Sequence, residues 1–276
     1  MKDEYAETLV ELEAALQVRH IAHRPLVTIA RDAKPAAAER LANGKTLNNL
    51  PVRGADGAIV GVLENINGEL PSVERPRLDV SAVSHSMRRL DDRIVVESRQ
   101  TIERLLQDLL SPPYYQLVVT DGRIDGIVTV SDLNKAPVRV LAYATMARLE
   151  TAMSVAIRTV TRNSDEAAIQ ALGEGGAGQV RGHHRQLREQ HLNVALLDAT
   201  TFRQKGIILA KLRVFAGGDD KTIQAEFDGL YERLRNPLMH MSPFVGESIP
   251  GLQRFAEDLE QARQRTKEAL VAADGL

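Results

Sequence analysis

The spacing of hydrophobic residues changes along the chain and divides it near residue 136. Before this point, short β-branched apolar runs alternate with helical stretches. The order strand, helix, hairpin is expected first over residues 26–64 and again over residues 94–130, with the two hairpins roughly 65 to 70 residues apart. Self-similarity at a fixed offset indicates a duplicated unit. We therefore expect an α+β pair of repeats in the first half.

From residue 137 onward the apolar residues recur at helical spacing and strand signals disappear. One apolar stripe over residues 137–161 is wide enough for the core of a helix bundle; it comprises Ala142, Met146, Leu149, Met153, Ala156 and Val160. Glycines at 173–178 are expected to break the helical run, and a later helix is expected to open at Asp219 or Asp220. A final helix is expected after Pro250, with Leu252, Phe255, Leu259 and Leu270 directed inward. The predicted domains are residues 1–136, which include an opening helix at 2–17, and an all-α bundle over residues 137–276.

Composition narrows the chemistry. None of the 276 residues is Cys, which excludes disulfides, thiolate nucleophiles and Cys-based metal sites. The formal net charge of −2 gives no global attraction for nucleic acid, so any RNA affinity must come from a local basic patch. The N-terminal residues are acidic, and no apolar run approaches the roughly 20 residues that span a bilayer. We expect a soluble cytoplasmic protein that does not enter a membrane.

The second repeat ends in Gly-Ile-Val-Thr-Val-Ser-Asp-Leu at residues 126–133. This stretch, at the end of a duplicated unit, resembles a CBS repeat, two of which pair in the family as a Bateman module. The resemblance implies an adenine-type nucleotide such as ATP or AMP as a regulatory ligand. It implies that Asp132 accepts from the ribose hydroxyls and that Thr129 contacts ribose or phosphate; two carboxylate oxygens suit a cis-diol. The alternative is an ordinary helix N-cap at the same residues.

The first repeat departs from this pattern. Glu64 occupies the position of Thr129, and Asn67 that of Asp132. Because a carboxylate beside a phosphate is repulsive, we expect one nucleotide site rather than two. Degenerate repeats of this kind also serve as dimerisation surfaces, so that role stays open.

The segment Tyr231–His240 carries the strongest catalytic pattern of the second half. On an uninterrupted helix Arg235 and His240 would point about 140° apart. Pro237 is expected to interrupt the helix, with Asn236 as the N-cap of a new turn, so that Arg and His converge. A neutral His can take a proton from a ribose 2′-hydroxyl, and Arg can hold the phosphate.

A helical bundle with Arg-Asn-x-x-x-His before one long closing helix resembles the HEPN superfamily, over roughly residues 137–270. The resemblance implies a metal-independent endoribonuclease for single-stranded RNA, in which two copies form one composite site. It assigns catalytic roles to Arg235, Asn236 and His240, and it needs no cofactor. It also places Glu150 where acids support such sites, with an ordinary surface acid of the helix as the alternative. A homodimer is expected, and an antitoxin is a candidate partner.

Other candidates are weaker. Arg181, Arg185 and Arg188 lie in one helical stretch and form a candidate RNA contact, with a solvated polar face as the alternative. No metal site is expected, because no acid or Cys completes a set around the histidines.

The predicted function is an endoribonuclease regulated by the nucleotide in the CBS pair. The alternative is a non-catalytic nucleotide sensor whose helical half dimerises or recruits a partner. A third hypothesis makes the helical half the target of a separate nucleotidyltransferase, with Tyr231 as the residue to examine.

Overall fold

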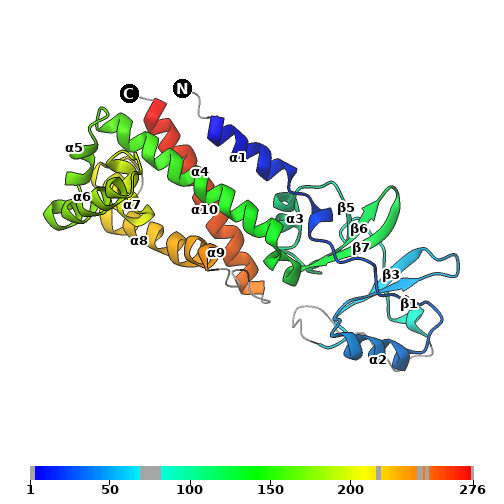
Figure 1. The fold of residues 1–276 in the computed structure, drawn as a ribbon. Helices are drawn as coiled ribbons and strands as arrows, with labels where there is room; N and C mark the ends of the chain where they lie inside the picture. The colour runs from blue at the N-terminus through cyan, green and yellow to red at the C-terminus, as the bar shows by residue number, and fades with distance from the viewer. Residues whose placement is uncertain (1–3, 69–81, 216–218, 241–244, 246–248, 275–276) are drawn as a thin grey trace. The chain divides into compact units, whose positions relative to one another are not determined.

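The computed structural model describes residues 4–68, 82–215, 219–240, 245 and 249–274 (Figure 1). It divides into two compact units. The helical unit comprises residues 1–14, 139–244 and 253–276, and the strand-containing unit comprises residues 15–138 and 245–252. The central boundary lies two residues from the expected one.

The opening helix departs from the predicted domains. Helix α1 (Glu4–Ala15) was expected in the N-terminal domain, but its residues up to Ala14 belong to the helical unit. Glu13 is buried and accepts hydrogen bonds from Arg148 (3.0 Å) and Thr145 (3.2 Å) of helix α4. A buried carboxylate needs such partners, and α4 supplies both of them.

The strand-containing unit holds the predicted duplication. In each repeat a short strand pairs in parallel with the first strand of a hairpin, and a helix joins the two. The first repeat consists of β1 (Ile29–Ala30), α2 (Pro35–Lys45), β2 (Leu50–Arg53) and β3 (Ile59–Leu63), with β4 (Arg88–Arg89) added at the sheet edge. The second consists of β5 (Val95–Glu97), α3 (Ile102–Asp108), β6 (Tyr115–Thr120) and β7 (Arg123–Thr129).

The two hairpins share their register as well as their order. Val52 pairs with Gly61 in the first hairpin, and Val118 pairs with Gly126 in the second. The register shifts directly after Val52 and directly after Val118, so the bulge is repeated too. Gly61 is required here, because a Cβ would lie 2.3 Å from the carbonyl oxygen of Arg88.

The helical unit is built on two long helices. These are α4 (Ala136–Val160) and α10 (Ile249–Asp274), whose first residues lie in the other unit. The remaining elements are α5 (Asp165–Gln170), α6 (Gly173–Glu189), α7 (Phe202–Lys211), α8 (Asp220–Leu230), a π-helical turn (Tyr231–Arg235) and α9 (Asn236–Met239). Five of the six residues of the predicted α4 stripe are buried, and Val160 is half-buried. This side of α4 therefore forms part of the core.

Two helical expectations were wrong. The interruption falls at Ala171 and Leu172, between α5 and α6, and not within residues 173–178. Gly173, with φ of +74°, begins α6, which runs through the other glycines. Ala177 and Val180 hold α6 in place by packing with Ile169 of α5 and Ala199. Leu270 of α10 was expected to point inward, but it is 44% exposed.

Helix α4 is long and apolar enough to cross a membrane by length and composition. The expectation of no such run was too strict. Of its most apolar window, 61% is buried by other residues, and core helices pass the same test.

Candidate functional site

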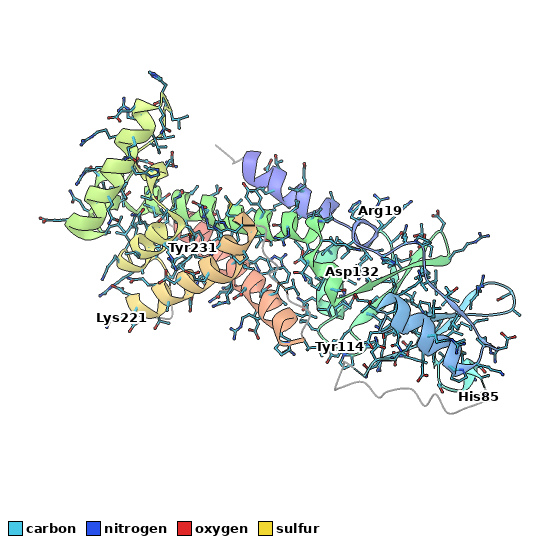
Figure 2. The ribbon with its side chains drawn as sticks, turned by 60° about the horizontal axis from the view of Figure 1, so that its bottom comes forward. Arg19, His85, Tyr114, Asp132, Lys221 and Tyr231 are labelled. Atoms are coloured by element: carbon cyan, nitrogen blue, oxygen red, sulfur yellow. The ribbon has the colours of Figure 1, made fainter. Side chains whose placement is uncertain are left out.

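Thr129 and Asp132 lie in one cleft of the strand-containing unit. The cleft has a volume of about 450 Å³ and is lined by both repeats. Thr129 is the last residue of β7, and Ser131 and Asp132 lie in the 3-10 helix that follows it (Val130–Asn134), whereas Asn48 and Asn49 come from the loop before β2. Tyr114, which precedes β6, also lines it, and Figure 2 labels Tyr114 and Asp132. The structure thus brings together the two residues that the sequence singled out.

Asp132 also takes part in a helix N-cap, which was the alternative role considered for these residues. Its Oδ2 accepts from the backbone N–H of Thr129 (2.8 Å) and from the Thr129 hydroxyl (3.1 Å). Its Oδ1 lies 2.7 Å from Nζ of Lys135, and the residue is only 8% exposed. The carboxylate is therefore held in one orientation, with Oδ1 paired to a half-exposed lysine rather than to backbone.

The equivalent residues of the first repeat have structural partners. Oε1 of Glu64 accepts from the hydroxyl of Tyr115 (2.8 Å) and from Arg88 (3.1 Å). Burial raises the pKa of the Tyr115 phenol, and the Glu64 charge raises it further. Asn67 bonds within its own repeat, donating to the Leu47 carbonyl (3.3 Å). Sequence reasoning missed Tyr115 as the partner of Glu64, since the two lie 51 residues apart.

The expected helix break at Pro237 is absent. A π-helical turn (Tyr231–Arg235) leads directly into α9, and Asn236 has helical angles, φ −65° and ψ −49°. Asn236 is therefore not an N-cap, because that position requires extended backbone. Pro237 is the second residue of α9 and has no N–H to donate to the preceding turn, which is π-helical rather than α-helical. His240 is the C-cap of α9, and its backbone N–H donates to the Asn236 carbonyl (3.1 Å).

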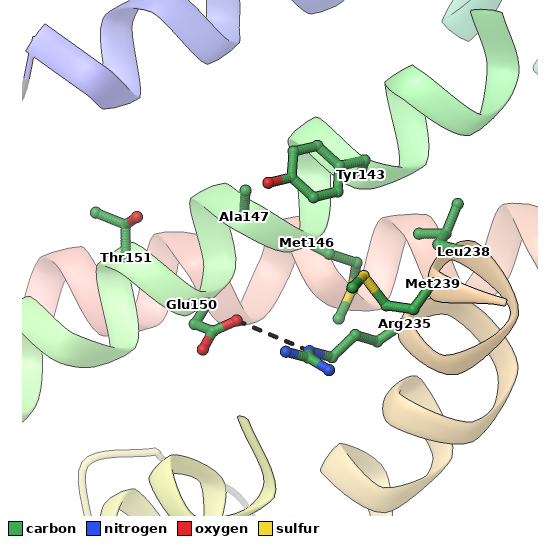
Figure 3. Close-up of a pocket in the computed structure, with 8 residues that line it drawn as sticks. All are labelled: Tyr143, Met146, Ala147, Glu150, Thr151, Arg235, Leu238 and Met239. Atoms are coloured by element: carbon green, nitrogen blue, oxygen red, sulfur yellow. Dashed lines mark ion pairs between the residues drawn. The ribbon is translucent and has the colours of Figure 1, made fainter. Parts of the chain in front are cut away.

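Arg235 and His240 are not joined by a contact among the described residues. Arg235 lines a cavity of about 280 Å³ in the helical unit, and His240 is exposed and outside that lining. Figure 3 shows the Arg235 guanidinium directed toward Glu150 of α4, with Met146 and Met239 beside it. No described contact brings the two side chains together, so their convergence within one copy of the chain stays a prediction.

Glu150 lies between two cations. Its Oε2 is 3.9 Å from Nε of Arg235, and its Oε1 is 2.9 Å from Nζ of Lys205. Lys205 lies on α7 and is 5% exposed. Sequence reasoning missed it, although a signal was present: Lys205 is three residues after Phe202 and four before Leu209, both of which are buried.

The three arginines of α6 do not share one environment. Arg181 forms an ion pair with Glu166, and this hydrogen bond raises the pKa of Arg181. Arg185 and Arg188 are exposed. The ring nitrogens Nδ1 of His183 and Nε2 of His184 lie 2.9 Å and 3.0 Å from backbone carbonyl oxygens, so both rings fasten α6 to the segment that follows it.

Across the described ranges, no group of three or more His, Cys, Asp or Glu side chains is arranged to hold a metal ion. The helical cavity instead offers a guanidinium, a carboxylate and apolar walls.

No protein-family model matches the chain. No curated protein sequence matches it either.

Solved structures of CBS-domain pairs are similar to about half of the chain. A CBS-pair protein from Arabidopsis thaliana is 19% identical with a TM-score of 0.38, covering 46% of this chain and 96% of its own. The CBS domain of a bacterial CNNM/CorC family Mg²⁺ transporter in complex with ATP is 21% identical with a TM-score of 0.37, over 50% and 94%. A CBS domain pair in complex with 5′-methylthioadenosine and S-adenosyl-L-methionine is 21% identical with a TM-score of 0.35, over 42% and 95%. Likenesses at these TM-scores do not establish the fold or ligand of this chain.

Proposed function

We propose that the strand-containing unit is a CBS pair that binds an adenine-type nucleotide and regulates the helical unit. The cleft shared by the two repeats carries this proposal, since Thr129 and Asp132 line it together. Its volume of about 450 Å³ is within the range of small-molecule sites. Adenine-type ligands are also present in two of the similar solved structures.

The cleft residues suit different parts of a nucleotide. Oδ1 of Asp132 has Lys135 as its described partner, and a carboxylate oxygen accepts a second hydrogen bond, so a ribose hydroxyl binds there beside that ammonium group or in its place. The hydroxyls of Thr129 and Ser131, 2.9 Å apart, are placed for ribose or phosphate oxygens. The first repeat contributes Asn48 and Asn49 to the opposite wall instead of a second acidic motif.

We further propose that the helical unit is a metal-independent endoribonuclease for single-stranded RNA, assembled from two copies. Arg235 supplies the phosphate-binding cation from its cavity, and His240 of the other copy supplies the general base. The exposed position of His240 favours this arrangement over catalysis within one copy. Asn236, which directly follows Arg235, adds a half-buried amide to the proposed site.

The test is cleavage of labelled single-stranded RNA in EDTA by wild type and His240→Ala, with and without ATP, AMP and cyclic nucleotides. We expect cutting that is lost in the variant and changed by one nucleotide. Mixing inactive Arg235→Ala with inactive His240→Ala should restore part of the activity, because a mixed dimer has one intact composite site. An antitoxin would inhibit this same activity.

The competing function is a non-catalytic sensor whose helical unit only dimerises or recruits a partner. Folded, dimeric wild type that cuts no RNA under any of these conditions, but binds a nucleotide, would establish it in place of the ribonuclease. Modification of Tyr231 by a nucleotidyltransferase is a third function, and a mass increase on that residue would reveal it.

A further inference from the structure

The charge balance around Glu150 has a consequence for Arg235. Three charged side chains meet there: Lys205, Glu150 and Arg235, with Glu150 in the middle. Glu150 and Arg235 both line the helical cavity, whereas Lys205 lies behind them in the core. These three groups carry two positive charges and one negative charge.

The two ion pairs of Glu150 differ in strength. The hydrogen bond from Lys205 is 2.9 Å long and buried at the lysine end. The approach of Arg235 is 3.9 Å and half-exposed, too long for a hydrogen bond. A short pair in a buried environment has the larger Coulomb energy, because both distance and effective dielectric constant are smaller. The carboxylate is therefore committed to Lys205.

We infer that Lys205 is a positioning residue that keeps Arg235 available for a phosphate group. Without its ammonium group, the Glu150 carboxylate would have Arg235 as its remaining cationic neighbour and would pair with it. A guanidinium that is paired with a carboxylate in the cavity binds an external anion less well, because the anion must displace or face that carboxylate. With Lys205 present, the charge of the Glu150 carboxylate in the cavity is balanced by the lysine. The cavity then offers an anion the guanidinium of Arg235, with apolar walls that include Met146, Leu238 and Met239.

The burial of Lys205 agrees with this role. Lysine is almost never fully buried unless it is paired, and a buried pair stabilises a fold weakly. An apolar residue at the same position of α7 would continue the core that Phe202 and Leu209 form. A charge placed there instead acts on Glu150, and through it on the cavity. The proposed function identifies the anion as an RNA phosphate, and the inference rests on it in that respect. The anion site itself is inferred from the charges around Glu150.

The experiment follows the Nε–H signal of Arg235 by NMR while inorganic phosphate is added to the full chain. Arg235→Met identifies the signal. Wild type should titrate, and Lys205→Met should bind phosphate about two- to fivefold more weakly, the usual size of one partly exposed ion pair. Lys211→Met removes an exposed lysine from the same helix and should leave the midpoint unchanged.

The double variant Lys205→Met/Glu150→Gln decides the mechanism. It removes both members of the buried pair, so Arg235 again has no carboxylate beside it and phosphate affinity should return close to that of wild type. A purely structural role of Lys205 predicts no such recovery. Lys205→Gln, which keeps a hydrogen-bond donor for Glu150, replaces Lys205→Met if that variant does not fold, and the same weakening is expected.

Three results would overturn the inference: no response of Arg235 to phosphate in wild type, unchanged affinity in Lys205→Met, or a double variant as weak as the single one. The ribonuclease proposal is judged separately by RNA cleavage. If wild type cuts no RNA but the phosphate affinities follow the expected series, the role of Lys205 holds and the ribonuclease proposal fails. If wild type cuts RNA but the affinities do not follow that series, the ribonuclease proposal holds and the role of Lys205 fails.

Discussion

The ammonium nitrogen of Lys135 lies 2.7 Å from Oδ1 of Asp132 and donates at 2.5 Å to the carbonyl of Ile21. The pair holds the end of β7 in the conformation in which Thr129 and Asp132 cap each other. Because a carboxylate oxygen accepts more than one hydrogen bond, a ligand can bind Oδ1 beside Lys135 or in its place and leave the capping bonds on Oδ2 intact. The capping bonds therefore fix Oδ2 of Asp132 in place, whereas Oδ1 is the oxygen that can accept from a ligand.

Replacing Asp132 with Ala should weaken nucleotide binding. The loss of a charged acceptor for the ribose hydroxyls should cost about 1 to 3 kcal/mol, or roughly five- to 150-fold in Kd. Calorimetric titration with ATP and AMP measures it. Asp125→Ala is the matched control, because Asp125 lies on β7 in the same repeat, pairs with Arg24 and is not part of the cleft lining. Equal affinity of wild type and Asp132→Ala for every adenine nucleotide would remove Asp132 from the ligand site.

The pair formed by Tyr115 and Glu64 should make the fold sensitive to alkali. Burial and the Glu64 carboxylate raise the pKa of Tyr115 above its usual 10.0. Above pH 10 the unfolded chain therefore loses this proton while the folded chain keeps it, so the stability present below that pH declines as pH rises. One proton corresponds to about 1.4 kcal/mol per pH unit.

Tyr115→Phe removes the phenol proton whose loss makes the unfolding free energy depend on pH. Its unfolding free energy, measured in urea from pH 8 to 11, should fall less steeply above pH 10 than that of wild type. At pH 8 it should be lower by about 1 to 3 kcal/mol, because Glu64 loses a buried donor. Parallel curves for the two proteins across this range would show that the Tyr115 phenol is not shielded as described.

The regular parts of the fold could be predicted from the sequence because each has a local signal. Asp121 and Gly122 both have positive φ, +50° and +75°, and form the two-residue turn that an Asp-Gly pair between two strands favours. Asp219 accepts from the backbone N–H of Thr222 and caps α8, which was expected to open at Asp219 or Asp220. Local chemistry decides such turns and caps.

The features that could not be predicted depend on long-range partners. Glu13 joins α1 to α4 through Arg148, 135 residues away. The helix continues through Pro237 because the turn before α9 is π-helical. No residue pattern within this segment predicts a π-helical turn. Glu150 was noted, but the position of Lys205 behind it depends on how α7 packs against α4. Candidate sites were thus located by motif, whereas their charge balance required the structure.

The exposed arginines of α6 should contribute to RNA affinity by neutralising phosphates. Changing Arg185 and Arg188 to Gln should weaken binding of a single-stranded oligonucleotide and lower the salt dependence, by about 0.7 in the log–log slope for each phosphate that is no longer neutralised. Fluorescence anisotropy at several salt concentrations measures both effects. Arg181→Gln should have the smaller effect, since Glu166 already pairs with that guanidinium. A slope unchanged in the double variant would assign α6 to the solvated surface.

The packing of Gly206 should reverse the usual effect of a glycine-to-alanine change in a helix. Gly206 is buried in α7, and an added Cβ would lie 2.8 to 3.0 Å from ring and Cβ atoms of Phe227 on α8. The gain in helix propensity, about 1 kcal/mol, is outweighed because α7 and α8 must move apart, at about 1 to 3 kcal/mol.

Gly178→Ala in α6 is the matched control: its Cβ would meet nothing within 4 Å, so it should stabilise by up to about 1 kcal/mol. Thermal unfolding of both variants should therefore shift in opposite directions from wild type. An increase in Tm for Gly206→Ala would mean that α7 and α8 have room to separate, and the geometry that places Lys205 against Glu150 would then be softer than the 2.9 Å contact indicates.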